Sequence, residues 1–153
     1  MFDPQRHSMV PHRSFGSYAK GEIFRAPGRT ITEGMFTAYQ GASGDNAQLH
    51  YDKVFLERIG HKNLFAHGFL TLIQSSIGAT TLAHELGESL IGFIEQSCKF
   101  LKPVYCKDTL YVEFEISDLI KSDSTGVMVL DVRIFNQQSD LVLCGKQKYL
   151  ISL

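Results

Sequence analysis

The sequence predicts a single α+β domain in which an antiparallel sheet wraps around a helix. A long run of apolar and small residues at helical spacing occupies the middle of the chain, and after Gly87 the pattern becomes that of strands. The 153 residues match the usual size of one domain, which needs no disulfide or metal to hold its core. We expect an N-terminal arm over residues 1–17, followed by the domain over 18–153.

The first part of the domain is expected to contain one strand and two short helices. The strand covers residues 21–31 and is broken by a Pro-Gly turn. Thr32 is a candidate N-cap for a short helix, which should stop at the turn-forming residues 41–45. A second short helix is expected over residues 51–59, with Gly60 as its C-cap.

The longest helix is expected to run from Gly68 to Leu86. Its apolar residues fall on nearly all of its sides, which indicates a helix buried almost all round. Four strands should follow, over residues 91–101, 109–118, 127–136 and 141–151. A sheet of about five strands curved around a single long helix is the hot-dog fold, which is the architecture that we predict.

Composition and charge argue against several other classes of protein. The formal net charge of -1 gives no electrostatic reason to bind nucleic acid or an anionic membrane. The N-terminus lacks the apolar segment of a signal peptide, and the longest apolar stretch, over residues 64–86, is too polar to span a membrane. The three cysteines show no paired spacing, which favours reduced thiols in a cytoplasmic protein and gives no zinc site.

The most informative segment reads SGDNAQLH over residues 43–50. It places the carboxylate of Asp45 and the imidazole of His50 five positions apart, which is the wrong spacing for one face of a helix. A loop could still bring both groups to one water molecule, where they would be suited to general acid–base chemistry. A Gly-Asp turn followed by a structural histidine would explain the same eight residues.

A second segment, AHGFL over residues 66–70, leads into the expected helix. The amide N–H groups at a helix start have no intrahelical partner, and the helix dipole there favours negative charge. The N–H of Gly68 is therefore a candidate oxyanion hole for a thioester carbonyl. A glycine that only opens a buried helix is an equally good explanation of this segment taken alone.

Together these two segments resemble the MaoC-like, (R)-specific enoyl-CoA hydratase family. The family signature runs S/G-G-D-x-N-P-x-H and is followed by A/V-H-G-M/F-L at the start of the helix. The matching residues are Ser43, Gly44, Asp45 and His50 in the first motif and residues 66–70 in the second. The resemblance extends from about Tyr18 to the C-terminus. The chain departs from the signature at Ala47 and Gln48, where the family usually has Asn and Pro.

The resemblance implies a hydratase/dehydratase that interconverts trans-2-enoyl and (R)-3-hydroxyacyl thioesters of CoA or acyl carrier protein. Asp45 and His50 would activate a water molecule, and the N–H of Gly68 would bind the thioester oxygen. Ser76 occupies the position of the family's serine on the central helix and would face the site. His67 belongs to the second motif but is interpreted as structural. Neither a metal nor a redox cofactor is required.

Two alternatives stay open at this point. A hot-dog acyl-CoA thioesterase would normally use a carboxylate on the central helix, but Glu85 and Glu88 both lie far towards its C-terminal end. A non-catalytic acyl-thioester-binding module is favoured by the altered Ala47 and Gln48. Under any of these functions at least a homodimer is expected, with a higher oligomer as the alternative, because one hot-dog unit leaves strand edges open and two-fold pairing is the commonest way to close them.

Overall fold

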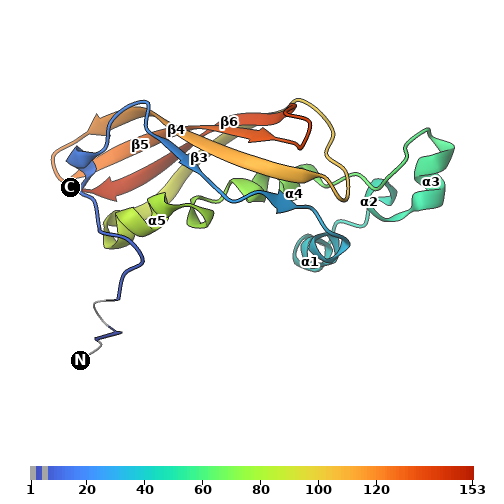
Figure 1. Ribbon diagram of the computed structural model, residues 1–153, viewed down its shortest axis with the longest axis horizontal. Helices are drawn as coiled ribbons and strands as arrows, with labels where there is room; N and C mark the ends of the chain where they lie inside the picture. Colours follow the sequence, from blue (N-terminus) through green and yellow to red (C-terminus); the bar gives the residue numbers. More distant parts are fainter. Residues whose placement is uncertain (1–2, 5–6) are drawn as a thin grey trace.

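The computed structural model describes residues 3–4 and 7–153 and shows a curved sheet with helices on one side of it (Figure 1). Residues 1–2 and 5–6 of the expected arm lie outside the described residues. The helices are α1 (Glu33–Ser43), α2 (Gln48–Tyr51), α3 (Lys53–Arg58), α4 (Gly68–Leu72) and α5 (Thr81–Leu86), with 3₁₀ turns η2 (Phe15–Ser17), η3 (Ile73–Ser75), η4 (Ile77–Ala79) and η5 (Gly87–Ser89). The strands are β1 (Ile23–Arg25), β2 (Arg29–Thr30), β3 (Leu90–Phe100), β4 (Thr109–Lys121), β5 (Thr125–Phe135) and β6 (Leu141–Ser152).

The strands expected from the sequence are confirmed, and the structure shows their order in the sheet. The strands run β1-β4-β5-β6-β3, every neighbouring pair is antiparallel, and β2 also pairs with β4. The Pro-Gly turn divides the expected first strand into β1 and β2, as the sequence indicated. Alternate residues of β4 are buried under the helices, namely Leu110, Val112, Phe114 and Ile116. This alternation places the core between the sheet and the helical layer.

The N-terminal helices are present with shifted ends. The Thr32 cap is confirmed, since its side chain accepts a hydrogen bond from the amide three residues later. α1 ends at Ser43, within the expected turn residues 41–45, and its C-cap is Gly44, whose φ of 72° is left-handed. The expected second helix is two helices, because Asp52 ends α2 and caps α3.

The central segment differs from the prediction of one unbroken helix from Gly68 to Leu86. It consists of α4, η3, η4 and α5, and the backbone is extended at Ser76 and Thr80. Three hydroxyl groups donate to the carbonyl three residues earlier: Ser75 to Leu72 at 2.6 Å, Ser76 to Ile73 at 2.9 Å and Thr80 to Ile77 at 2.7 Å. Such bonds compete with the helical pattern, so they favour breaks at these positions.

The segment is also less buried than predicted. Phe69 is 66% exposed and Ile73 is 53% exposed, so one side of the segment faces outward. Within residues 3–4 and 7–153, none of the helices combines the length and apolar character that crossing a bilayer requires.

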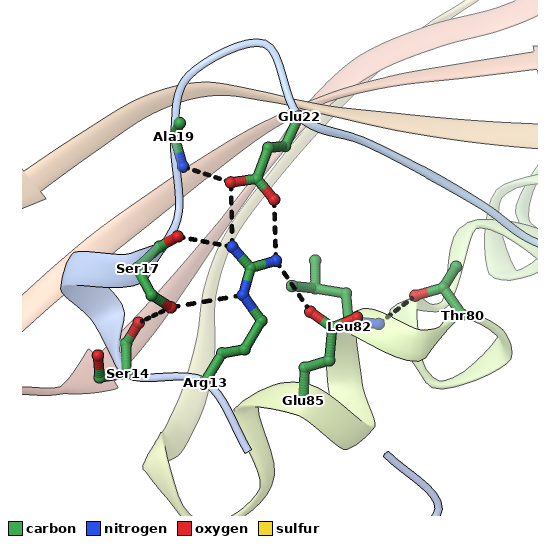
Figure 2. Close-up of polar contacts among 8 residues, drawn as sticks. All are labelled: Arg13, Ser14, Ser17, Ala19, Glu22, Thr80, Leu82 and Glu85. Atoms are coloured by element: carbon green, nitrogen blue, oxygen red, sulfur yellow. Dashed lines mark hydrogen bonds and ion pairs between the residues drawn. The ribbon is translucent and has the colours of Figure 1, made fainter. Parts of the chain in front are cut away.

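The end of the expected arm is fixed to the domain by Arg13 (Figure 2). Its guanidinium donates to both carboxylate oxygens of Glu22, at 2.9 and 3.1 Å, and to Glu85 at 3.2 Å. The same group lies 4.0 Å from the ring centre of Tyr18. Two residues later, Phe15 is buried in the core. The chain is therefore packed on the domain from residue 13 onward.

We expect Arg13→Met to lower the free energy of unfolding by about 1 kcal/mol at neutral pH, because it removes a partly buried bidentate ion pair. The hydrogen bond from Arg13 holds the pKa of Glu22 below its ordinary value of 4.5. This stabilisation is therefore present above the ordinary glutamate pKa and is lost as the pH falls through the lowered value. Urea unfolding at neutral and at acid pH measures both effects.

Lys20→Met is the matched control, because the ion pair between Lys20 and Asp118 is exposed, with Lys20 63% exposed. It should change the unfolding free energy little at either pH. An Arg13→Met penalty of the same size at acid and neutral pH would argue against the assigned role of Glu22.

Candidate active site

Asp45 lies in the turn between α1 and α2, and His50 lies in α2, so that their side chains meet. Gly44 turns the chain at the end of α1, and Asp45 Oδ1 then accepts a hydrogen bond from the amide of Ala47 at 3.0 Å. This bond leaves Oδ2 facing Nε2 of His50, 4.0 Å away. The structure thus brings together the two side chains that the sequence placed five positions apart.

The hydrogen bond on the far side of His50 fixes its tautomer. Nδ1 lies 2.8 Å from the carbonyl oxygen of Phe65, which can only accept, so Nδ1 carries the proton. In the neutral ring, Nε2 then presents its lone pair towards Asp45. The 4.0 Å separation is too long for a direct hydrogen bond and suits a water molecule that donates to both groups.

His67 lies directly against His50, which the interpretation of His67 as a structural residue did not anticipate. Their ring centres are 3.7 Å apart at an interplanar angle of 28°, and Nε2 of His67 lies 2.9 Å from the hydroxyl of Tyr51. His67 is only 2% exposed. Burial, and next the proximity of His50, lower the pKa of His67, so His67 stays neutral beside the pair at neutral pH.

One signal in the sequence could have placed His67 at the site. It immediately precedes Gly68, so a fold that brings Gly68 to the substrate also brings His67 close. The ring of Tyr39 in α1 lies 4.5 Å from that of His67 and completes an aromatic wall behind the pair.

Asp45, His50 and His67 also present metal-ligand atoms within 4.8 Å of one another. A zinc ion needs lone pairs that converge on one point about 2.0–2.1 Å from each nitrogen. The in-plane lone pairs of two stacked imidazoles lie side by side and do not converge, and Nδ1 of His50 is already bonded to Phe65. The geometry suits an acid–base pair better than a metal centre.

Gly68 is the first residue of α4 and lies beside a cavity of about 340 Å³, whose walls include Phe65, Thr71 and Phe100. Among the described residues, no hydrogen-bond acceptor is seen for the N–H of Gly68. Because α4 has only five residues, its dipole contributes less than the expected long helix would have done. Within the described part of the chain, the N–H of Gly68 is nevertheless an unpaired donor, which is the kind of group that an oxyanion hole requires.

Ser76 is not joined to the pair by a hydrogen bond in the described part of the chain. Its hydroxyl donates to the carbonyl of Ile73, and the residue lines a separate cavity of about 310 Å³ with Phe93 and Gln147. The break in the helix at Ser76 changes the direction of the segment that was expected to carry it into the site. A role for Ser76 in substrate binding stays a prediction.

Comparison with known proteins identifies a family and several similar structures. The model of the family described as MaoC like domain matches residues 15–137. No curated protein matches the chain. A solved structure of a monoamine oxidase regulatory protein from Archaeoglobus fulgidus is 26% identical, with a TM-score of 0.85 over 95% of this chain and 98% of that one.

Two further structures are similar in fold. The unliganded R-hydratase of Pseudomonas aeruginosa is 24% identical, with a TM-score of 0.73 over 90% of this chain and 84% of its own. A conserved Mycobacterium tuberculosis protein with a double hot-dog fold is 24% identical, with a TM-score of 0.78 over 92% of this chain and 44% of its own. The predicted hot-dog fold is confirmed, and the family match covers most of the 153 residues. The chain therefore belongs to the MaoC-like dehydratase family.

Proposed function

We propose that the chain is a hydratase/dehydratase that interconverts trans-2-enoyl and (R)-3-hydroxyacyl thioesters of CoA or acyl carrier protein. The observation that carries the proposal is the pair formed by Asp45 Oδ2 and His50 Nε2, 4.0 Å apart, with the lone pair of Nε2 free. The family assignment and the similarity in fold to an R-hydratase support the same reaction class.

In the hydration direction, a water molecule donates one O–H to His50 Nε2 and the other to Asp45. As Nε2 takes a proton, the water oxygen bonds to C3 and the electrons of the double bond move towards the thioester. The N–H of Gly68 donates to the thioester oxygen as negative charge develops on it. The pair then returns a proton to C2, so that one water is added in total, and dehydration is the reverse sequence.

Asp45 is still held in place although Ala47 and Gln48 replace the Asn and Pro of the family signature. The contact that holds Asp45 comes from the backbone amide of Ala47, which does not depend on its side chain. This weakens the argument for a non-catalytic binding module. The thioesterase alternative is weakened as well, since Glu85 is hydrogen-bonded to Arg13 and its side chain is only 15% exposed (Figure 2).

Incubation with crotonyl-CoA separates the three candidate functions. A hydratase lowers the absorbance of the enoyl thioester and releases no free thiol. A thioesterase releases the CoA thiol, which a thiol reagent detects, and a binding module changes neither signal. Release of thiol without hydration would refute the proposed function. So would unchanged enoyl absorbance and no free thiol when the protein is saturated with crotonyl-CoA.

We also propose that the chain forms a homodimer through the edge of the sheet at β3. Ile91, Phe93 and Ile94 on this edge strand are each more than half exposed, and such an edge is a template for pairing. A relative with two hot-dog units in one chain supports the same arrangement. Sedimentation should give about twice 17.2 kDa at micromolar concentration, and a stable monomer would contradict the proposal.

A further inference from the structure

The orientation of the His50 ring decides whether Nε2 faces the water molecule of the proposed reaction. Within residues 3–4 and 7–153, the ring makes one hydrogen bond, between Nδ1 and the carbonyl oxygen of Phe65 at 2.8 Å. A hydrogen bond tolerates bending of about 30° before it weakens, and the torsion that turns an imidazole ring has only a broad preference. This bond therefore fixes the tautomer of His50 but leaves the plane of its ring loosely held.

The ring of His67 supplies the constraint that this hydrogen bond lacks. It lies face to face with the ring of His50, with the ring centres 3.7 Å apart and an interplanar angle of 28°. At this separation the two rings are in van der Waals contact, so the His50 ring cannot turn on that side without its edge meeting His67. The plane of the His50 ring is therefore set by His67.

His67 can support another ring because it is itself held on several sides. It is 2% exposed, and its Nε2 lies 2.9 Å from the hydroxyl of Tyr51 in α2. The rings of Phe36 and Tyr39, both in α1, lie 5.5 and 4.5 Å from that of His67. Because His67 immediately precedes α4, this cluster joins three helices towards one end of the sheet (Figure 1).

The charge and the hydrogen bonds of His67 suit a supporting ring. Its pKa is lowered by burial and next by the proximity of His50, so at neutral pH it does not repel the positive charge that His50 gains with a proton. Nδ1 of His67 is buried and has no hydrogen-bond partner among the described residues. The ring therefore acts through its face and through its contact with Tyr51.

We propose, on the basis of the function inferred above, that His67 is a positioning residue for His50. The face of its ring, anchored by Tyr51, holds the imidazole of His50 in the plane in which Nε2 points at the water shared with Asp45. His67 takes no proton itself, since it lies over the face of His50 and not in line with Nε2. Its contribution is orientation, and a misplacement of about 1 Å at a reacting group can cost about 10²-fold in rate.

Substitution of His67 tests this role through the rate of crotonyl-CoA hydration. His67→Ala should lower kcat about 10²-fold and change KM little, because the water molecule and not the thioester is misplaced. The double variant His67→Phe, Tyr51→Phe restores a flat ring against His50 and removes the hydroxyl that would face that ring. Its kcat should return to within about fivefold of the wild type, which is the usual worth of one lost hydrogen bond.

His61→Ala is the matched control for these variants. The ring of His61 packs against Phe65 at 4.5 Å, so this substitution removes a histidine ring near the site without removing the support of His50, and kcat should stay near that of the wild type. If His67→Ala does not fold, His67→Met takes its place, because methionine fills the space without a flat ring.

The nitrogen chemical shifts of the His50 ring test the positioning without turnover. They are identified by their absence in His50→Ala and are measured at alkaline pH, where imidazoles are neutral. With Nδ1–H held on the carbonyl of Phe65, the two nitrogens should have well-separated shifts. In His67→Ala these shifts should move towards each other, as the ring turns and both tautomers become populated. The double variant should separate them again.

This pattern of shifts supports the inference even if the protein does not hydrate crotonyl-CoA, a result that would refute only the proposed function. Unchanged shifts in folded His67→Ala would overturn the inference at any rate of turnover. So would a raised KM with unchanged kcat, which would place the effect on substrate binding. A double variant as slow as His67→Ala would also overturn it, because a nitrogen of His67, and not the face of its ring, would then be required.

Discussion

Asp45→Asn and His50→Ala should each lower turnover of a 2-enoyl thioester by about 10²- to 10⁴-fold, which is the usual contribution of a general acid–base group. The asparagine would keep the size of the side chain but could no longer hold the charge that orients the water. The alanine would remove the lone pair on Nε2 that faces Asp45 at 4.0 Å. Steady-state rates with crotonyl-CoA measure the loss, and thermal unfolding shows whether each variant is folded.

His61→Ala is the matched control for these two variants. His61 lies outside the pair and packs its ring against Phe65 at 4.5 Å, so its loss should leave turnover near that of the wild type. Near wild-type rates in both Asp45→Asn and His50→Ala, on a substrate that the parent protein hydrates, would end the assignment of the pair.

Gly68→Pro should lower kcat/KM about 10²- to 10³-fold relative to Gly68→Ala, because proline lacks the N–H that we assign to the thioester oxygen. The backbone tolerates proline here. Gly68 is the first residue of α4, and the ψ of 140° at His67 suits a residue before proline. Both substitutions bring a Cβ about 3.3 Å from the ring of Phe100, so alanine controls for crowding. Equal rates in the two folded variants would remove Gly68 from the mechanism.

The strands and the capped helices could be predicted because their signals are local. The alternation in β4 and β5, the Pro-Gly break and the Thr32 cap each depend on a few neighbouring residues. The break of the central helix could not be predicted in the same way. The hydroxyl of Ser75 donates to the carbonyl of Leu72 in α4. The carbonyl of Ser75 also accepts a hydrogen bond, at 2.9 Å, from Nε2 of Gln147 in β6, which is 72 residues away in the sequence.

The candidate site likewise has parts that local sequence signals predict and parts that depend on long-range packing. Asp45, His50 and Gly68 could be identified from two short motifs. The stacking of His67 on His50 and the 2.9 Å contact of His67 with Tyr51 depend on how the loop after α1 folds back over the start of α4. The unpaired Oε1 of Gln74 likewise could not be predicted from a helical pattern, because burial and the lack of a partner among the described residues are properties of the packed chain.

The chirality of the product tests the central claim most directly. A substrate whose thioester oxygen is held by the N–H of Gly68 is fixed at one end. Asp45, in the turn after α1, and His50, in α2, lie next to each other, so they present water to one face of the double bond. Chiral chromatography of the hydrolysed product from crotonyl-CoA should therefore give a single enantiomer, and the resemblance to (R)-specific hydratases predicts (R)-3-hydroxybutyrate. An (S) product would contradict the proposed assignment, and a racemate would contradict the fixed geometry of the site.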